Sequence, residues 1–316
     1  MVSGGCWLLM LSPSSSLRRA RALLGTLVEI KATGADQVLS AAVDAAFAEI
    51  EWVQRLMSFH DPNSDVSLLN RCAYKRAIKI NPRTWAVLAR AREIAKVSGG
   101  AFDVTVAPRL VKWGFLPAAD GAANLEVKQD GYRRIELLED CAVRFREPAQ
   151  LDLGGIAKGY AVDRAARALE GHGIRDYVVN AGGDLRVGAT AEAIHVRHPA
   201  CPQRLVPMGM LRSAAIATSA DYFTRKKIGG RYVHAIVAPS GGRPAKQRAS
   251  VSVVAAECMT ADALTKVAAL LRERAVSVLA RFDAEGILID RRGARLLSSS
   301  ARSTSSFGVG AGCALP

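Results

Sequence analysis

The amino-acid sequence predicts an α+β fold, in which helices and antiparallel strands mix without a regular strand–helix alternation. Residues 35–57 and 82–97 carry apolar side chains at helical spacing. Residues 132–138 and 141–146 alternate in polarity around a short acidic turn, as the two strands of a hairpin do. A doubly wound sheet would need a helix after each parallel strand, so the irregular order favours α+β.

The first half of the chain predicts one strand followed by two long helices. A β-type run covers residues 24–30, and the helix over 35–57 has Asp36 as its expected N-cap. Residues 67–70 suggest a short helical turn. The helix over 82–97 has Asn81 as its cap and Pro82 as its first residue, and it ends at a pair of glycines.

The most informative stretch is residues 150–169, which predicts a loop, a glycine turn and then a helix ending at Gly171. Backbone N–H groups at such a turn bind phosphate, and Lys158 would add a cation. The glycine spacing matches neither the Walker motif nor the dinucleotide fingerprint. A glycine that only permits tight packing explains this stretch equally well.

The second half predicts a series of strands interrupted by two helices. A helix is expected to begin with Thr260 as its cap, and another covers residues 275–282. The expected strands are residues 177–180 and 185–187 on either side of a glycine pair, then 215–219, 232–237, 250–255 and 286–290.

Composition limits the classes of function. The chain has 316 residues, half of them hydrophobic, and a formal net charge of +14 at pH 7. The charge allows nucleic-acid binding, but the basic residues are scattered and form no stripe with aromatic residues, so we expect a solvated surface that attracts phosphorylated cofactors and no nucleic acid. The six cysteines form no CxxC pair and no metal-ligand spacing with histidine, so we expect free, mostly buried thiols.

The domain organisation is expected to be simple. We predict a flexible N-terminal segment over residues 1–20, one domain over 21–296 and a disordered tail rich in Ser, Gly and Ala over 297–316. The apolar run near the N-terminus is too short for a signal-peptide core or a membrane span, so we expect a cytoplasmic protein.

Eight sequence blocks, in order over residues 23–270, resemble the ApbE family of FAD:protein FMN transferases. The blocks are LLGTLVEI, MSFHDPNSDVSLLN, GAFDVTVAP, LDLGGIAKGYAVD, VVNAGGDLRVG, AIATSADY, YVHAIVAPSGGRP and TADALTKVAAL. The resemblance implies a T-fold-like core with an added lobe. It also implies transfer of FMN from FAD to a Thr or Ser hydroxyl of an acceptor flavoprotein, with Mg²⁺ as cofactor and AMP as the leaving group.

The resemblance places the metal at four residues. Asp262 matches the metal carboxylate, and Gly155 matches the position whose backbone carbonyl completes the site. The family carries a hydroxyl residue four positions after this acid, where this chain has Lys266, with Thr265 one place earlier. Two interpretations follow: Thr265 replaces the missing hydroxyl, or Lys266 supplies part of the metal's charge.

The resemblance also implies the cofactor contacts. Asp152 and Lys158 match residues that contact FAD, with Lys158 as the cation for the diphosphate. The other matching positions are Ala101, Phe102 and Asp103 along the adenosine, His60 as a stacking ring, Ile236 as a backbone contact, and Leu24 where the family often has Met. Some of these residues have plain structural explanations: Phe102 as core, Lys158 as a solvated helix residue, and Asp262 as an acid near a helix start.

The resemblance implies His234 as the general base, because a histidine precedes the corresponding loop in the family, and a side chain that exchanges protons near neutral pH suits this role. It lies one residue further from Pro239 than is usual in the family, and Ala238 and Gly241 stand where Asp and Thr are customary. A structural strand histidine is the alternative. A protein that binds FAD or hydrolyses it to FMN and AMP without transfer would keep the same fold. The sequence names no acceptor, and the resemblance allows a membrane-associated redox protein.

Overall fold

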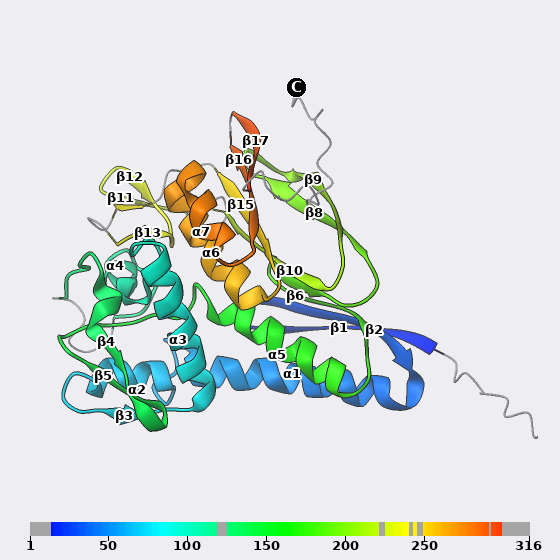
Figure 1. The fold of residues 1–316 in the computed structure, drawn as a ribbon, viewed down its shortest axis with the longest axis horizontal. Coiled ribbons are helices and arrows are strands. Elements are labelled where there is room, and N and C mark those ends of the chain that lie inside the picture. Colours follow the sequence, from blue (N-terminus) through cyan, green and yellow to red (C-terminus); the bar gives the residue numbers. More distant parts are fainter. Residues whose placement is uncertain are drawn as a thin grey trace, which may run out of the picture.

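A computed structural model describes residues 14–118, 125–220, 225–239, 243–244, 249–290 and 292–298. Within these residues the central element is an eight-stranded sheet in the order β1-β2-β6-β7-β10-β15-β16-β17, with every neighbouring pair antiparallel (Figure 1). The strands are β1 Ser14–Leu23, β2 Thr26–Ala35, β6 Asp176–Ala181, β7 Asp184–Val187, β10 Ala214–Ala220, β15 Ser250–Ala255, β16 Glu285–Asp290 and β17 Gly293–Leu297.

The sheet lies between two apolar layers. Helices α1 Asp36–Met57, α5 Ala157–Gly171 and α6 Cys258–Leu271, with α7 Val276–Ala280, cover one face (Figure 1). The hairpin of β8 Glu192–His198 and β9 Cys201–Leu211 covers the other. Successive strand residues point to opposite faces. Accordingly, Val253 packs with the helices, whereas Val254 packs with Ile194 of the hairpin.

A lobe is inserted between α1 and α5 and lies beside the sheet core in Figure 1. It contains α2 Asp65–Cys72, α3 Pro82–Val97, α4 Ala107–Lys112 and a small sheet of β3 Ile78–Lys79, β5 Ala142–Phe145 and β4 Ile135–Leu137. Two short ribbons pair β11 Lys226–Ile228 with β12 Arg231–Val233, and β13 Val237–Ala238 with β14 Arg243–Pro244. Among the described helices, none has the length and apolar character to cross a membrane.

Several sequence predictions are confirmed. The fold is α+β with antiparallel sheets, and a core with an added lobe matches the expected architecture. Helix α3 has the expected bounds, with the Asn81 side chain accepting from Arg83 N at 3.0 Å. The strand expected over residues 250–255 is β15, buried along its whole length because both faces of the sheet are covered.

Three helix boundaries differ from the predictions. Ala35, not Asp36, is the N-cap of α1. Helix α6 begins at Cys258 with Glu257 as N-cap, so Thr260 lies inside the helix. Gly171, which was expected to follow the helix, is the last residue of α5. The left-handed conformation typical of a glycine after a helix occurs at Gly173, with φ +80°.

Strand boundaries also needed correction. Leu24 and Gly25, with φ of 55° and 70°, form the turn between β1 and β2, so the strand begins at Thr26. The strand expected over 232–237 is split between β12 and β13. The hairpin of β4 and β5 is confirmed but shorter, and the helical turn at 67–70 extends over all of α2. Strands β1, β8, β9 and β17 were not expected.

The ends of the domain differ in part from the prediction. Residues 14–20 belong to β1, so the expected flexible segment does not reach residue 20. Leu297 ends β17, while Gly241, residues 299–316 of the expected tail and residues 1–13 lie outside the described part. The four described cysteines are free, as expected, but only Cys258 of these is buried.

Helices α5 and α6 approach each other closely at Gly159. A Cβ on Gly159 would lie 2.3 Å from the Cys258 carbonyl oxygen and 2.8 Å from Met259 Cα. The neighbouring atoms belong to backbone, which cannot move aside as a flexible side chain can. Glycine at this position is therefore required by packing, as the structural interpretation of this stretch anticipated.

We expect Gly159→Ala to lower the free energy of unfolding by about 1–3 kcal/mol, the usual cost of overpacking. Gly171→Ala is the matched control in the same helix, because nothing lies within 4 Å of its added Cβ. This control should stay within about 1 kcal/mol of the parent, on the stabilising side. Urea unfolding of both variants measures the difference; equal stability would contradict the close approach of the helices.

Candidate functional site

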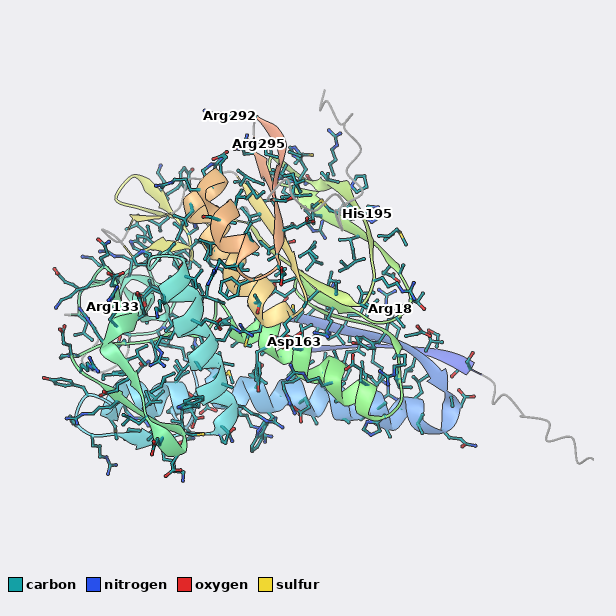
Figure 2. The ribbon with its side chains drawn as sticks, in the orientation of Figure 1. Arg18, Arg133, Asp163, His195, Arg292 and Arg295 are labelled. Carbon is teal, nitrogen blue, oxygen red and sulfur yellow. The ribbon has the colours of Figure 1, made fainter. Side chains whose placement is uncertain are left out.

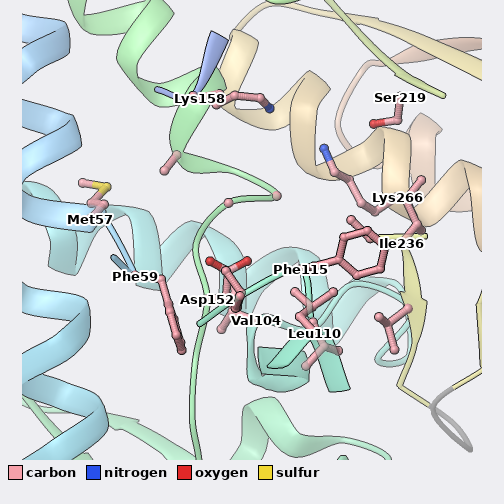
Figure 3. A pocket seen from close by; sticks show the side chains of 18 of the residues that line it. Met57, Phe59, Val104, Leu110, Phe115, Asp152, Lys158, Ser219, Ile236 and Lys266 are labelled. Atoms are coloured by element: carbon pink, nitrogen blue, oxygen red, sulfur yellow. The ribbon is translucent and has the colours of Figure 1, made fainter. Parts of the chain in front are cut away.

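A cleft of about 740 Å³ is lined by both the core and the lobe (Figure 3). The lobe contributes an apolar wall, and the core contributes the glycine loop before α5, the end of β10 and one residue of α6. The wall includes Phe59, Phe102, Val104, Leu110 and Phe115. An apolar cavity of this size with a few polar groups is typical of a small-molecule site.

Four charged side chains form a cluster at the polar side of this cleft. Lys158 Nζ lies 2.7 Å from Asp184 Oδ2 and 3.7 Å from Asp262 Oδ2. Lys266 Nζ donates to Asp262 Oδ1 and, at 3.0 Å, to the Asp262 carbonyl oxygen. Both lysines line the cleft, and Figure 3 shows them reaching toward one region from α5 and α6.

The two acids of the cluster are buried behind the lysines. Asp262 is fully buried and Asp184 is 3% exposed. Burial opposes the charge of Asp262, but Lys158 and Lys266 outweigh it and hold its pKa below the usual range. Burial and the adjacent Asp262 raise the pKa of Asp184. The pKa of Lys158 is raised because both acids outweigh its burial, so Lys158 keeps its charge.

The helices that present this cluster are joined by a second buried acid–cation pair. Asp163 of α5 accepts from Cys258 N at 2.9 Å and Met259 N at 2.8 Å, at the start of α6 (Figure 2). Arg186 Nη1 lies 2.9 Å from the same carboxylate. An acid at a helix N-terminus is favoured by the helix dipole. Asp163 thus fixes the first turn of α6, four residues before Asp262.

All eight residues predicted to bind the cofactor line the cleft. They are Leu24, His60, Ala101, Phe102, Asp103, Asp152, Lys158 and Ile236. Leu24 lies in the turn between β1 and β2, and His60 is exposed in the loop after α1. Phe102 is 4% exposed and belongs both to the core and to the cleft wall, so its structural interpretation and its predicted role are compatible.

The two acids predicted to contact the cofactor have local backbone partners. Asp103 accepts from Thr105 N at 2.9 Å, Thr105 Oγ1 at 2.7 Å and Tyr132 N at 2.9 Å, so its carboxylate holds the lobe together. Asp152 is half-buried, and its carboxylate accepts from Gly154 N in the glycine loop. Loss of water raises the pKa of both carboxyl groups.

His234 is 2% exposed and borders the cleft between β12 and β13. Its Nδ1 accepts from Ile236 N at 3.3 Å, so in the neutral ring the hydrogen resides on Nε2. To act as a base, the ring must release this long hydrogen bond and take the proton at Nδ1, or first exchange tautomer.

The residues assigned to a metal come together, but around the Lys266 side chain. Gly155 lines the cleft next to Lys266, whose Cε lies 3.5 Å from where a Cβ of Gly155 would be. Thr265 is fully buried; its Oγ1 donates to the Asp262 carbonyl at 2.7 Å and lies 2.7 Å from Ser219 Oγ. No group of three His, Cys, Asp or Glu suited to a metal occurs among the described residues.

Asp184 is the member of the cluster that sequence reasoning missed. It follows the glycine pair Gly182–Gly183, whose φ values of 65° and 100° make the tight turn between β6 and β7. An acid directly after a two-glycine turn was a usable signal. Its partner Lys158 is 26 residues away, however, and only the paired sheet and α5 bring them together.

The chain matches the ApbE family over residues 24–288. A relative from Vibrio cholerae, an FAD:protein FMN transferase, is 32% identical over 245 residues, which cover 72% of this chain and 73% of that protein. The ApbE protein of Thermotoga maritima has a similar structure, with a TM-score of 0.79, 26% identity and coverage of 89% of this chain and 96% of that one. The structure of the flavin transferase ApbE of Vibrio cholerae is also similar, with a TM-score of 0.75 and 28% identity. The match covers 91% of this chain and 98% of that one.

We expect Asp262→Asn to lower the free energy of unfolding at pH 7 by about 3–5 kcal/mol, because Lys158 and Lys266 lose a buried counter-charge. Asp44→Asn is the control: Asp44 is half-exposed and paired with two arginines, so its change should cost less than about 1 kcal/mol. Urea unfolding measures both variants, and equal losses would show that the buried cluster does not stabilise the fold.

The pH dependence has a defined sign. Because the pKa of Asp262 is lowered in the folded state, its stabilisation is present above the pKa of the unfolded chain and is lost as the pH falls through the folded value. The difference in free energy of unfolding between the parent and Asp262→Asn should therefore persist down to about pH 4 and become smaller only below this pH.

Proposed function

The chain belongs to the ApbE family, and from this premise we propose that it transfers FMN from FAD to a Thr or Ser hydroxyl of an acceptor flavoprotein, releasing AMP. The curated relatives that it matches are FAD:protein FMN transferases, which makes the chain a transferase. The observation that carries the proposal is the cleft itself, in which an apolar aromatic wall adjoins Lys158 at the start of α5 and Lys266 of α6.

The chemistry of FAD fits this arrangement. FAD has a flat aromatic ring system at each end and a diphosphate between them. Lys158 and Lys266 offer positive charge to the diphosphate. Ala157 N, Gly159 N and Tyr160 N in the first turn of α5 already donate hydrogen bonds within the protein. Phe59, Phe102 and Phe115 offer flat apolar faces to the rings.

The reaction is a displacement at one phosphorus atom. The acceptor hydroxyl oxygen forms a bond to the phosphorus on the FMN side, and the bond from that phosphorus to the bridging oxygen breaks. The bridging oxygen leaves with AMP, and the hydroxyl proton passes to a base. The protein has mainly to hold the diphosphate, neutralise its developing charge and align the hydroxyl.

His234 is the residue that we propose for taking the hydroxyl proton. It is a buried histidine at the border of the cleft, whereas His60 lies in the exposed loop after α1. Proton transfer to Nδ1 requires release of the long hydrogen bond from Ile236 N. Such a base contributes about 10²–10⁴-fold to the rate.

The Mg²⁺ implied by the resemblance does not fit the described residues as they stand. A divalent cation needs several oxygen ligands with open lone pairs. Lys266 Nζ donates to one carboxylate oxygen of Asp262 and Gly159 N donates to the other at 3.2 Å, so a cation approaching from the cleft would meet the ammonium group. The Thr265 hydroxyl is occupied with Ser219 and the helix backbone. No step of the proposed mechanism is therefore assigned to a metal.

With FAD and an acceptor domain that carries a threonine, the parent protein should raise the acceptor mass by one FMN unit and release AMP. His234→Ala should lower the rate about 10²–10⁴-fold while FAD affinity stays within a few-fold. His195→Ala is the control, because His195 is exposed on β8, on the far side of the sheet (Figure 2).

Mass spectrometry of the acceptor and chromatography of AMP give the readout. Release of AMP without a labelled acceptor would support FAD hydrolysis instead of transfer. Full transfer by His234→Ala would show that another residue is the base.

We further expect the protein to bind FAD at least about tenfold more tightly than riboflavin, because one charge-assisted hydrogen bond contributes about 1.5–3 kcal/mol. Lys158→Gln should narrow this preference, while Lys96→Gln on the exposed side of α3 should not. Titration by flavin fluorescence measures both affinities, and equal binding of riboflavin and FAD would refute diphosphate recognition by the cluster.

A further inference from the structure

We propose that the Lys266 ammonium is a built-in cation that performs the charge neutralisation expected of a divalent metal, so that this chain transfers FMN without Mg²⁺. The inference rests on the proposed function. It is drawn from the position of Lys266 among the very residues that the family resemblance assigned to the metal.

Lys266 lies at the position that the metal would occupy. Lys266 lies four residues after Asp262 on α6, one helical turn away on the same face. Its Nζ contacts both the side chain and the backbone carbonyl of Asp262. Its stem runs beside Gly155 of the glycine loop. The positive charge therefore stands between the buried acid and the loop, where a metal joining them would also have to stand.

The Thr265 hydroxyl does not face the cleft. Thr265, the substitute for the absent hydroxyl, is fully buried and does not border the cleft. Its bonds to the Asp262 carbonyl and Ser219 tie α6 to β10. Lys266, by contrast, lines the cleft. The chain thus presents a cation, not an oxygen ligand, at this point of the wall.

The charges of the buried cluster already balance without a metal. The cluster holds two acids, Asp184 and Asp262, and two lysines, Lys158 and Lys266. A divalent ion at Asp262 would place two further positive charges within a few ångströms of both ammonium groups, which is strongly unfavourable at a buried site. Removal of Lys266 would leave a net negative cluster that requires an added cation.

The ammonium group can do this work on the substrate. It carries three hydrogens, and Asp262 accepts two of them. Among the described residues no other acceptor contacts Lys266 Nζ, so the third hydrogen can be donated to a phosphate oxygen, as by the lysine of a phosphate loop. In this arrangement Asp262 positions the cation, and Lys266 contacts the diphosphate.

The test compares metal dependence in the parent protein and in Lys266→Thr, which restores a hydroxyl four residues after Asp262. FMN attachment to the acceptor and FAD affinity are each measured in EDTA and in millimolar Mg²⁺. The parent should transfer FMN in EDTA within about twofold of its rate in Mg²⁺. In EDTA, the rate of FMN transfer by Lys266→Thr should be about 10²–10³-fold lower than that of the parent, the usual cost of removing one stabilising group. Addition of Mg²⁺ should restore both its transfer rate and its FAD affinity.

Two further variants complete the test. Lys266→Arg keeps a cation and should remain independent of metal, while Lys96→Thr on α3 should behave as the parent. Transfer by the parent that stops in EDTA and returns with Mg²⁺ would overturn the proposal, whether or not Lys266→Thr folds. Absence of both FAD binding and FMN transfer in EDTA and in Mg²⁺ would overturn the proposed function as well. This result differs from loss of transfer in EDTA alone, so the failure of the proposed function can be told apart from the failure of metal independence.

Discussion

The close contact of α5 with α6 at Gly159 is the constraint on which the site depends. It brings the amide of Gly159 to the carboxylate of Asp262 and places Lys158, one residue earlier, beside the same acid. Asp163 holds the start of α6 from the next turn of α5. Without this contact, the fully buried carboxylate of Asp262 would lose Gly159 N and Lys158 and keep only Lys266 of its own helix, and burial of a poorly paired charge is strongly unfavourable.

The charge cluster is better explained by chemistry than by stability. A buried ion pair is often no more stabilising than apolar residues of the same volume, because desolvation offsets the attraction. The fold nevertheless brings two acids and two lysines together from α5, α6 and the turn between β6 and β7. Both lysines reach the cleft, so the acids keep the two positive charges in place next to an apolar wall.

Local signals predicted much of the fold, and the failures share a physical reason. Asn81 and Pro82 define the start of α3 by themselves, and the apolar run of β15 indicates a strand covered on both faces. The start of α6 was misplaced because its N–H groups are capped by Asp163, 95 residues earlier. Strand β1 was missed because its arginines suggest a solvated segment, although Arg19 and Arg21 pair with Asp44 of α1.

The candidate site was predictable to the extent that its residues lie within single motifs. Lys158, Asp262 and the glycine loop could be named from the sequence, and the departure at Lys266 was visible there. What the sequence could not show is that Lys266 folds back onto Asp262 and that Asp184 neutralises Lys158, because both depend on packing between elements far apart in the chain.

The most direct test of this account is a crystal structure of the protein with FAD, grown in Mn²⁺ and measured at the manganese absorption edge. The account predicts that the diphosphate oxygens lie within hydrogen-bond distance of Lys158 and Lys266, with no manganese signal at Asp262. A manganese ion bound to Asp262 with Lys266 turned away, or a diphosphate bound elsewhere, would contradict it.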